Sequence, residues 1–197
     1  MLSTVYLLIA VVDLVVLVWA AWLCWRHRTN GLIFASIPLT LLWYDNLTVG
    51  LGATLGEGDL LIGMNLVRFL AHYIGLPMTF IAMGAMAREV GFGWARSKWT
   101  MAAFCSVACA FIVHDLWLFS AATFYPSCFA DTLRYTTYIA DYTACTPDAD
   151  IGAGMRIGPV PAITLTLMLI VFGGYLWAKT GWKWLMIGAV GSMAFFA

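Results

Sequence analysis

The sequence predicts an all-α membrane protein, a bundle of about six transmembrane helices that forms a single domain over residues 1–197. Two observations lead to this fold class. Hydrophobic residues make up 63% of the chain and charged residues only 10%, and the mean hydropathy is +0.90. An average soluble domain is about 45–50% apolar and about 25% charged, and a soluble fold of this size leaves roughly a third of its surface in water. Lipid is the solvent that suits this composition.

Each predicted span is a stretch of roughly twenty mostly apolar residues, which is the length that a helix needs to cross a bilayer. Six stretches qualify or nearly qualify, namely residues 4–25, 32–51, 60–87, 99–123, 159–178 and 182–197. The last is short and ends on Phe196 and Ala197 without a polar exit. We therefore expect either that the natural chain extends beyond Ala197 or that this helix crosses the membrane only in part.

The connections between the spans differ in charge, which predicts their orientation. The odd-numbered connections hold seven of the ten basic residues: Arg26, Arg28, Arg88, Arg96, Lys98, Lys179 and Lys183. The even-numbered ones hold mainly acidic residues: Glu57, Asp59, Asp131, Asp141, Asp148 and Asp150. Because basic loops stay in the cytoplasm, the N-terminus is predicted to lie outside, with short cytoplasmic loops. We expect a multi-pass protein of the bacterial cytoplasmic membrane, the cell inner membrane. The net charge of zero argues against a nucleic-acid partner.

The segment 124–158 is the longest polar stretch and is predicted to be an outer loop between the fourth and fifth spans. It contains Cys128 and Cys145, and two thiols outside the cytoplasm are able to oxidise. We predict a disulfide between them, closing a loop of about 17 residues that contributes roughly 3 kcal/mol in the entropic model. Within the loop, Tyr135, Tyr138 and Tyr142 follow helical spacing, which predicts a short helix lying on the outer surface.

Ionisable residues inside the spans point to a functional site. Each costs a few kcal/mol near the bilayer centre, so it usually faces the bundle interior and has a partner. At about 1.5 Å per residue, three helices bring such groups to the same outer-leaflet depth. These residues are Asp45 on the second span, Arg68 and His72 on the third, and His114 and Asp115 on the fourth. Asp13, on the first span, lies closer to mid-depth.

The third span carries a polar stripe along one face. Asn65, Arg68, His72 and Thr79 are separated by three, four and seven residues, steps that keep them on one side of a helix. The stripe is expected to point at the carboxylates of Asp45 and Asp115. Two interpretations stay open here. Arg68 forms a buried ion pair that fixes the helix register, or the same residues line a small polar chamber.

Three main functional hypotheses follow. In the first, the site binds or converts a lipid-like or other amphipathic small molecule, with membrane lipids as partners, and the residues leave open whether the protein is an enzyme. Arg68 would hold an anionic or carbonyl group, with Asn65, Tyr44 and Asn46 beside it. His72 and His114 would act as acid or base, and Asp45 and Asp115 would orient the imidazoles, so these four are the candidate catalytic residues.

The other hypotheses use the same bundle differently. His72 and His114 could ligate a b-type haem or a metal, although the chain has no histidine-rich ligand motif and no metal site is predicted. Alternatively, the protein is a non-catalytic accessory subunit of a larger electron-transfer or pigment-binding complex, with other membrane subunits, pigments or quinones as partners. A further hypothesis is a path for protons or ions through Asp13, Asp45 and His114.

Overall fold

The computed structural model describes residues 1–157 and 160–193 of the chain, and 75% of the protein is helical. The α-helices are α1 (Leu2–His27), α2 (Asn30–Leu55), α3 (Asp59–Glu89), α4 (Lys98–Ser120), α5 (Val160–Thr180) and α6 (Trp184–Met193). Two short 3-10 helices, η1 (Gly93–Arg96) and η2 (Asp141–Thr143), and two strands, β1 (Tyr125–Phe129) and β2 (Thr132–Thr136), complete the described elements. The prediction of a mainly α-helical fold is confirmed.

The helices α1 to α5 are each long and apolar enough to cross a membrane, and they coincide with the first five predicted spans. Side chains of α1 illustrate why, because nearly all of them are apolar and those turned away from α2, such as Leu14, Val11 and Val12, are exposed. A helix that is hydrophobic on all sides needs an apolar surrounding. The predicted span at residues 182–197 lies partly outside the described residues. Within the described part it contains α6, Trp184–Met193.

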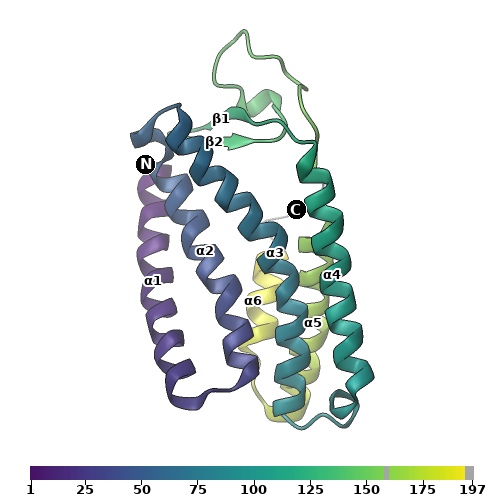
Figure 1. The fold of residues 1–197 in the computed structure, drawn as a ribbon. Coiled ribbons are helices and arrows are strands. Elements are labelled where there is room, and N and C mark those ends of the chain that lie inside the picture. The colour runs from purple at the N-terminus through teal and green to yellow at the C-terminus, as the bar shows by residue number, and fades with distance from the viewer. Residues whose placement is uncertain (158–159, 194–197) are drawn as a thin grey trace.

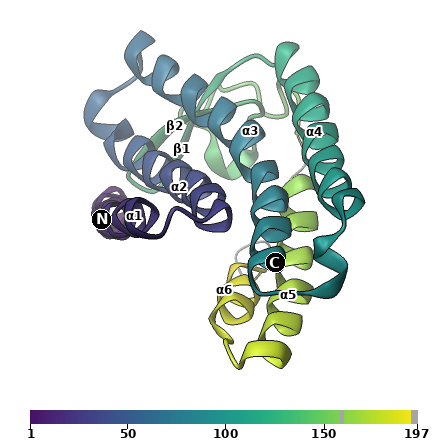
Figure 2. The same ribbon diagram turned by 60° about the horizontal axis from the view of Figure 1, so that its bottom comes forward.

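The helix α3 is the centre of the bundle (Figure 1). It packs against α2 on one side and against α4 and α5 on the other, while α1 packs on α2 and α6 on α5. Viewed from the end away from the strands, α3 lies between the α1–α2 pair and α4 (Figure 2). Gly75 allows α2 to approach α3 closely, because a Cβ atom there would lie 1.6 Å from Cδ1 of Leu41.

The main apolar core lies between α3, α4 and α5, in the half of the bundle away from the strands. Phe80 and Met83 of α3, Phe172 and Leu176 of α5, and Phe92 of the α3–α4 connection are all buried there. Phe80 also stacks on Phe111 of α4, with ring centroids 5.7 Å apart. This core fixes the spacing of α3, α4 and α5 and leaves their other halves free to surround polar groups.

Residues 125–136 form an antiparallel hairpin at one end of the bundle, and this corrects the prediction of a surface helix. Tyr135 lies in β2, Tyr138 forms an isolated β-bridge with Gly154, and Tyr142 lies in η2. Threonine and tyrosine are residues that strands favour, and pairing β2 with β1 satisfies the backbone of both. The tyrosine spacing that suggested a helix is therefore incidental.

The predicted disulfide between Cys128 and Cys145 is confirmed, with a Cα–Cα distance of 4.9 Å. It joins β1 to the segment after η2, so it ties the hairpin to the loop that follows. We use the name cap for residues 125–157, the hairpin together with this loop.

Opening this disulfide is expected to lower the free energy of unfolding by about 3 kcal/mol, because the 17-residue loop regains its freedom in the unfolded chain. The thermal midpoint of purified protein should fall by several degrees with reductant and in a Cys128→Ser/Cys145→Ser variant. Cys105→Ser, which removes an unbridged thiol, is the control. Two extra alkylatable thiols in unreduced wild-type protein would contradict the bridge.

The cap rests on the same end of the bundle as the start of α1 and the α2–α3 turn. Asp131, in the hairpin turn, accepts hydrogen bonds from the N-terminal ammonium group and from the backbone N–H of Leu2. At Gly52 of α2 the contact is so close that a Cβ atom would lie 1.7 Å from the backbone oxygen of Leu133. The hairpin is thus seated directly on helix backbone.

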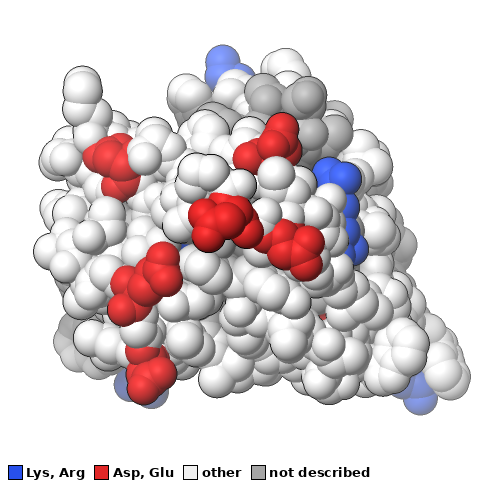
Figure 3. All heavy atoms as spheres, turned by 90° about the horizontal axis from the view of Figure 1, so that it is seen from above, with Lys and Arg blue, Asp and Glu red and all other residues white. Residues whose placement is uncertain are grey.

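The surface at the cap end is acidic (Figure 3). Carboxylates from the α2–α3 turn, the start of α3 and the cap gather on this side of the molecule: Glu57, Asp59, Asp131, Asp141, Asp148 and Asp150. The last turns of α1 and α3 and the α5–α6 connection lie at the opposite end (Figure 1) and carry basic residues, among them Arg26, Arg88 and Lys183. The charge asymmetry seen in the sequence is therefore an asymmetry between the two ends of the bundle.

Candidate functional site

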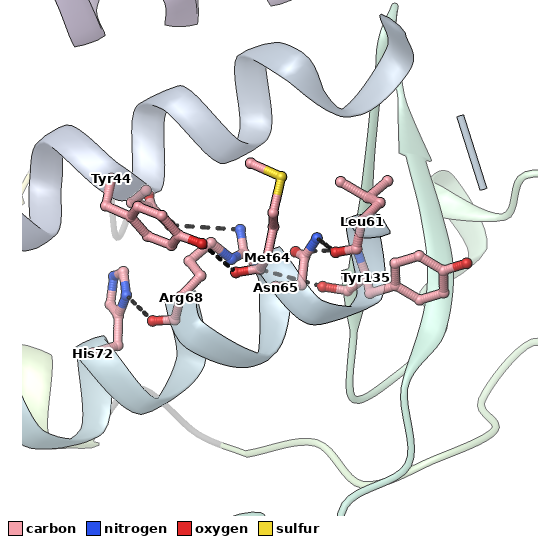
Figure 4. A network of polar contacts seen from close by, with 8 residues as sticks. Tyr44, Leu61, Met64, Asn65, Arg68, His72 and Tyr135 are labelled. Carbon is pink, nitrogen blue, oxygen red and sulfur yellow. Dashed lines mark hydrogen bonds and ion pairs between the residues drawn. The ribbon is translucent and has the colours of Figure 1, made fainter. Parts of the chain in front are cut away.

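Polar residues on one face of α3 connect the bundle to the cap (Figure 4). Asn65 is fully buried. Its Nδ2 donates to the backbone oxygen of Leu61, one helical turn earlier, over 2.8 Å. Its Oδ1 accepts the backbone N–H of Tyr135 in β2 over 3.2 Å. Since a buried amide must find partners for both of its ends, Asn65 holds the strand at a defined height on α3.

Arg68 lies one turn further along α3 and is only 7% exposed. Its Nη1 is 3.5 Å from Oδ1 of Asp45 on α2, and its Nη2 donates to the backbone oxygen of Tyr135 over 3.2 Å. The guanidinium also lies over the ring of Phe69, 4.9 Å from the centroid. One side chain therefore joins α2, α3 and β2, and its charge is balanced by Asp45.

A cavity of about 350 Å³ opens beside this ion pair. Its walls come from α2, α3, α4, α5, the strand β2 and the end of the cap. The polar lining residues are Asp45, Arg68, His72, Tyr73, Asp115 and Arg134, and the apolar ones are Phe69, Leu76, Ile157, Pro161 and Ala162. The cavity thus combines two guanidinium groups, two carboxylates, an imidazole and a phenol with an apolar wall.

His72 has a defined proton arrangement. Its Nδ1 is 3.1 Å from the backbone oxygen of Arg68, and because a carbonyl oxygen only accepts, Nδ1 carries the hydrogen and donates it. In a neutral imidazole the other nitrogen, Nε2, then holds a lone pair. His72 lines the cavity, so its imidazole is the ring nitrogen base among the lining residues.

Four of the residues singled out from the sequence surround this one cavity, namely Asp45, Arg68, His72 and Asp115. Asp115 is almost fully buried and comes from α4. The predicted convergence of three helices is therefore present in the structure, and the ion pair and the chamber, which the sequence offered as alternatives, occur together.

Four other candidates lie outside the cavity wall. The His114 side chain is 54% exposed, and its ring Nδ1 is 3.0 Å from Oδ1 of the adjacent Asp115. Asn46 donates from Nδ2 to Asp13 of α1 over 2.8 Å. Tyr44 donates its hydroxyl hydrogen to the backbone oxygen of Met64 over 3.2 Å, and Asn65 binds the backbone of Tyr135 in the cap. Asn46, Tyr44 and Asn65 thus serve helix–helix or helix–cap contacts.

Arg134 and Tyr73 line the cavity but did not emerge from the sequence. Tyr73 follows His72 directly, and its helix position is not on the polar stripe. Arg134 lies in the segment predicted to be a loop, where no depth could be assigned. One sequence feature pointed to Arg134: it and Arg156 are the two basic residues in the long acidic segment 124–158.

Comparison of the chain with protein-family models, curated proteins and solved structures finds no match. The site is therefore interpreted from its own geometry. Among the described residues, no three histidine, cysteine, aspartate or glutamate side chains gather in a way that could hold a metal ion. Of the two histidines that the haem or metal hypothesis uses, His72 lines the cavity and His114 lies outside its wall.

Proposed function

We propose that this protein is a multi-pass membrane protein that binds an amphipathic, lipid-like small molecule in the cavity between α2, α3, α4, α5 and the cap. The observation that carries the proposal is the mixed lining of one cavity inside an apolar bundle, with charged groups on one part of the wall and apolar side chains on another. Its volume of about 350 Å³ is in the range of small-molecule sites, which span roughly 300–1,000 Å³.

The charged part of the wall argues for a ligand with a polar end. Ionisable groups inside a membrane bundle are costly, and they tend to mark sites where a substrate or ion is handled. Here Arg68 and Arg134 offer planar sets of donors, which suit carboxylate, phosphate or carbonyl oxygens. The apolar part, with Leu76, Pro161 and Ala162, suits a hydrocarbon or ring system.

The same wall offers proton chemistry should the ligand be converted. The Nε2 of His72 would accept a proton from a ligand hydroxyl or carbon acid, and Asp115 lies on the opposite helix, α4. Binding requires neither step, whereas a conversion would depend on His72.

The charge distribution and the disulfide support an orientation with the cap outside the cytoplasm. Basic residues cluster at the end away from the cap, as the positive-inside rule expects for cytoplasmic loops. Disulfides persist in oxidising compartments, and the Cys128–Cys145 bridge lies in the cap. The cavity would then open near the outer leaflet of a bacterial cytoplasmic membrane.

Filling the cavity tests the proposal. Ala162→Phe places a ring into the wall on α5 and is expected to reduce the amount of co-purified amphipathic molecule by about tenfold or more, which corresponds to about 1.4 kcal/mol of binding. Wild-type and variant proteins are purified in mild detergent, and the bound molecules are quantified by mass spectrometry. The matched control is Leu167→Phe on the same helix, because Leu167 is half exposed.

Equal amounts of bound molecule in the Ala162→Phe and Leu167→Phe proteins would refute binding in this cavity. The same preparations separate the other hypotheses. Stoichiometric partner chains in place of a small molecule would support the accessory-subunit hypothesis, and a Soret absorption band would support haem.

A further inference from the structure

A second hollow of about 400 Å³ lies within the cap itself. Its walls come from β1, β2, η2 and the segment that leads toward α5, and the disulfide Cys128–Cys145 ties these parts together. Most of its lining side chains are hydroxyl-bearing or charged. We call it the cap pocket, to distinguish it from the bundle cavity described above.

Arg134 lines both the cap pocket and the bundle cavity. It lies in β2 directly across from Ser127 of β1. Its Nε and the Oγ of Ser127 are both buried, and neither has a hydrogen-bond partner within the part of the chain that the structure describes. Buried donors without acceptors are unfavourable. Both atoms belong to residues that line the same pocket, so a small turn of either side chain would bring its donor to a ligand oxygen there.

The charges of the pocket define the ligand. Arg134 and Arg156 both line it, and Arg156 lies over the ring of Tyr138, 5.9 Å from the centroid. The single carboxylate in the wall belongs to Asp141, which is exposed. Arg156 is an exposed residue. The wall therefore carries two guanidinium groups against one carboxylate, and their planar donors match the oxygens of an oxyanion.

We propose that the cap pocket binds a single phosphate group, held between Arg134 and Arg156 with a hydrogen bond from the hydroxyl of Ser127. The hydroxyls of Tyr138 and Tyr142 supply further donors from the wall. The acidic surface around the cap (Figure 3) disfavours polymeric anions such as nucleic acids, because their many charges would face these carboxylates. The phosphate is either a free ion or the head group of a lipid.

Calorimetric titration of the purified full chain in a neutral detergent tests this site. One arm uses inorganic phosphate, and the other uses a short-chain phosphatidic acid below its micelle concentration. Binding of inorganic phosphate supports a free-ion site, and binding of the phosphatidic acid alone supports a lipid head group. The absence of binding in both arms would overturn the proposal.

Matched variants locate the binding. Arg156→Gln and Ser127→Ala are each expected to weaken the interaction by about tenfold, a change of about 1.4 kcal/mol. Arg96→Gln, at an exposed arginine of the opposite end, should leave it unchanged. Equal affinity in the Arg156→Gln and Arg96→Gln proteins would overturn the assignment to the cap pocket. Correct folding is checked by the thermal midpoint and by the protection of Cys128 and Cys145 from alkylation.

This inference stands apart from the proposed function, and the experiments separate the two. Ala162→Phe fills the bundle cavity and should leave phosphate affinity unchanged, whereas Arg156→Gln should leave the amount of co-purified amphipathic molecule unchanged. Failure of one experiment therefore leaves the other proposal standing.

Discussion

Gly52→Ala is expected to unseat the cap and to lower the free energy of unfolding by about 3 kcal/mol, at the upper end of overpacking effects. The added Cβ atom would lie 1.7 Å from the backbone oxygen of Leu133 and 2.9 Å from its carbon. Both atoms belong to main chain, so no side-chain rotation relieves the overlap. The hairpin must move away from α2, which also separates Tyr135 from Arg68 and Asn65. Thermal unfolding in detergent measures the loss.

Gly63→Ala is the matched control for this change. Gly63 is a helical glycine of α3, and a Cβ atom there meets open space. Alanine is a better helix former than glycine by about 1 kcal/mol, so this variant should be as stable as the wild type or slightly more stable. Equal thermal midpoints for the two variants would show that the cap does not rest on Gly52.

Arg68→Leu should destabilise the protein by about 3 kcal/mol, the low end of the range for breaking a buried ion pair. The low end applies because the Asp45 side chain is 25% exposed, so water still reaches the stranded carboxylate. The substitution also removes a donor from the backbone oxygen of Tyr135. The thermal midpoint reports stability, and mass spectrometry reports the bound amphipathic molecule, which should be lost as well.

Adding Asp45→Asn to Arg68→Leu separates the structural role of the arginine from its binding role. The double variant has no uncompensated charge, so most of the lost stability should return, and a double-mutant cycle measures the coupling. Recovery of stability without recovery of the bound molecule would place Arg68 in contact with the ligand. Recovery of both would leave it a purely structural residue, and an undiminished midpoint in Arg68→Leu itself would contradict the ion pair.

The five long helices were predictable because composition alone decides them. The predicted span 60–87 became α3 at Asp59–Glu89, and 4–25 became α1 at Leu2–His27. The helices α1, α2 and α3 extend past their predicted spans at both ends, whereas α4 ends at Ser120, short of the predicted 123. In lipid the backbone must form its hydrogen bonds within the helix, so hydropathy and length are enough to predict where such a helix lies.

The depth of the site residues was predictable, and so was their direction on α3, where Arg68 of the polar stripe meets Asp45. Their direction on α2 and α4 was not. Counting residues along each helix placed Asp45, Arg68 and Asp115 at one level. However, neighbouring residues on a helix point about 100° apart. Asp115 therefore faces the cavity while His114 is exposed, and Asp45 meets Arg68 while Asn46 meets Asp13 of α1. A helix that is apolar all around gives no signal for this rotation.

The hairpin and the role of Arg134 were not predictable from local pattern. Strand pairing depends on a partner segment and on the surface beneath it. Here that surface consists of Gly52 on α2 together with Asn65 and Arg68 on α3. The cysteines were the exception, because a covalent bond depends on chemistry and compartment more than on local conformation.

The alternation of side chains along β2 restricts insertions and deletions in this part of the sequence. Tyr135 meets α3 through its main chain, while the preceding Arg134 borders both hollows. Removing or adding one amino acid between Cys128 and Arg134 would turn the following side chains of the strand to the opposite face, carrying the guanidinium away from its neighbours. Natural variants should therefore keep the number of residues from Cys128 to Tyr135 constant.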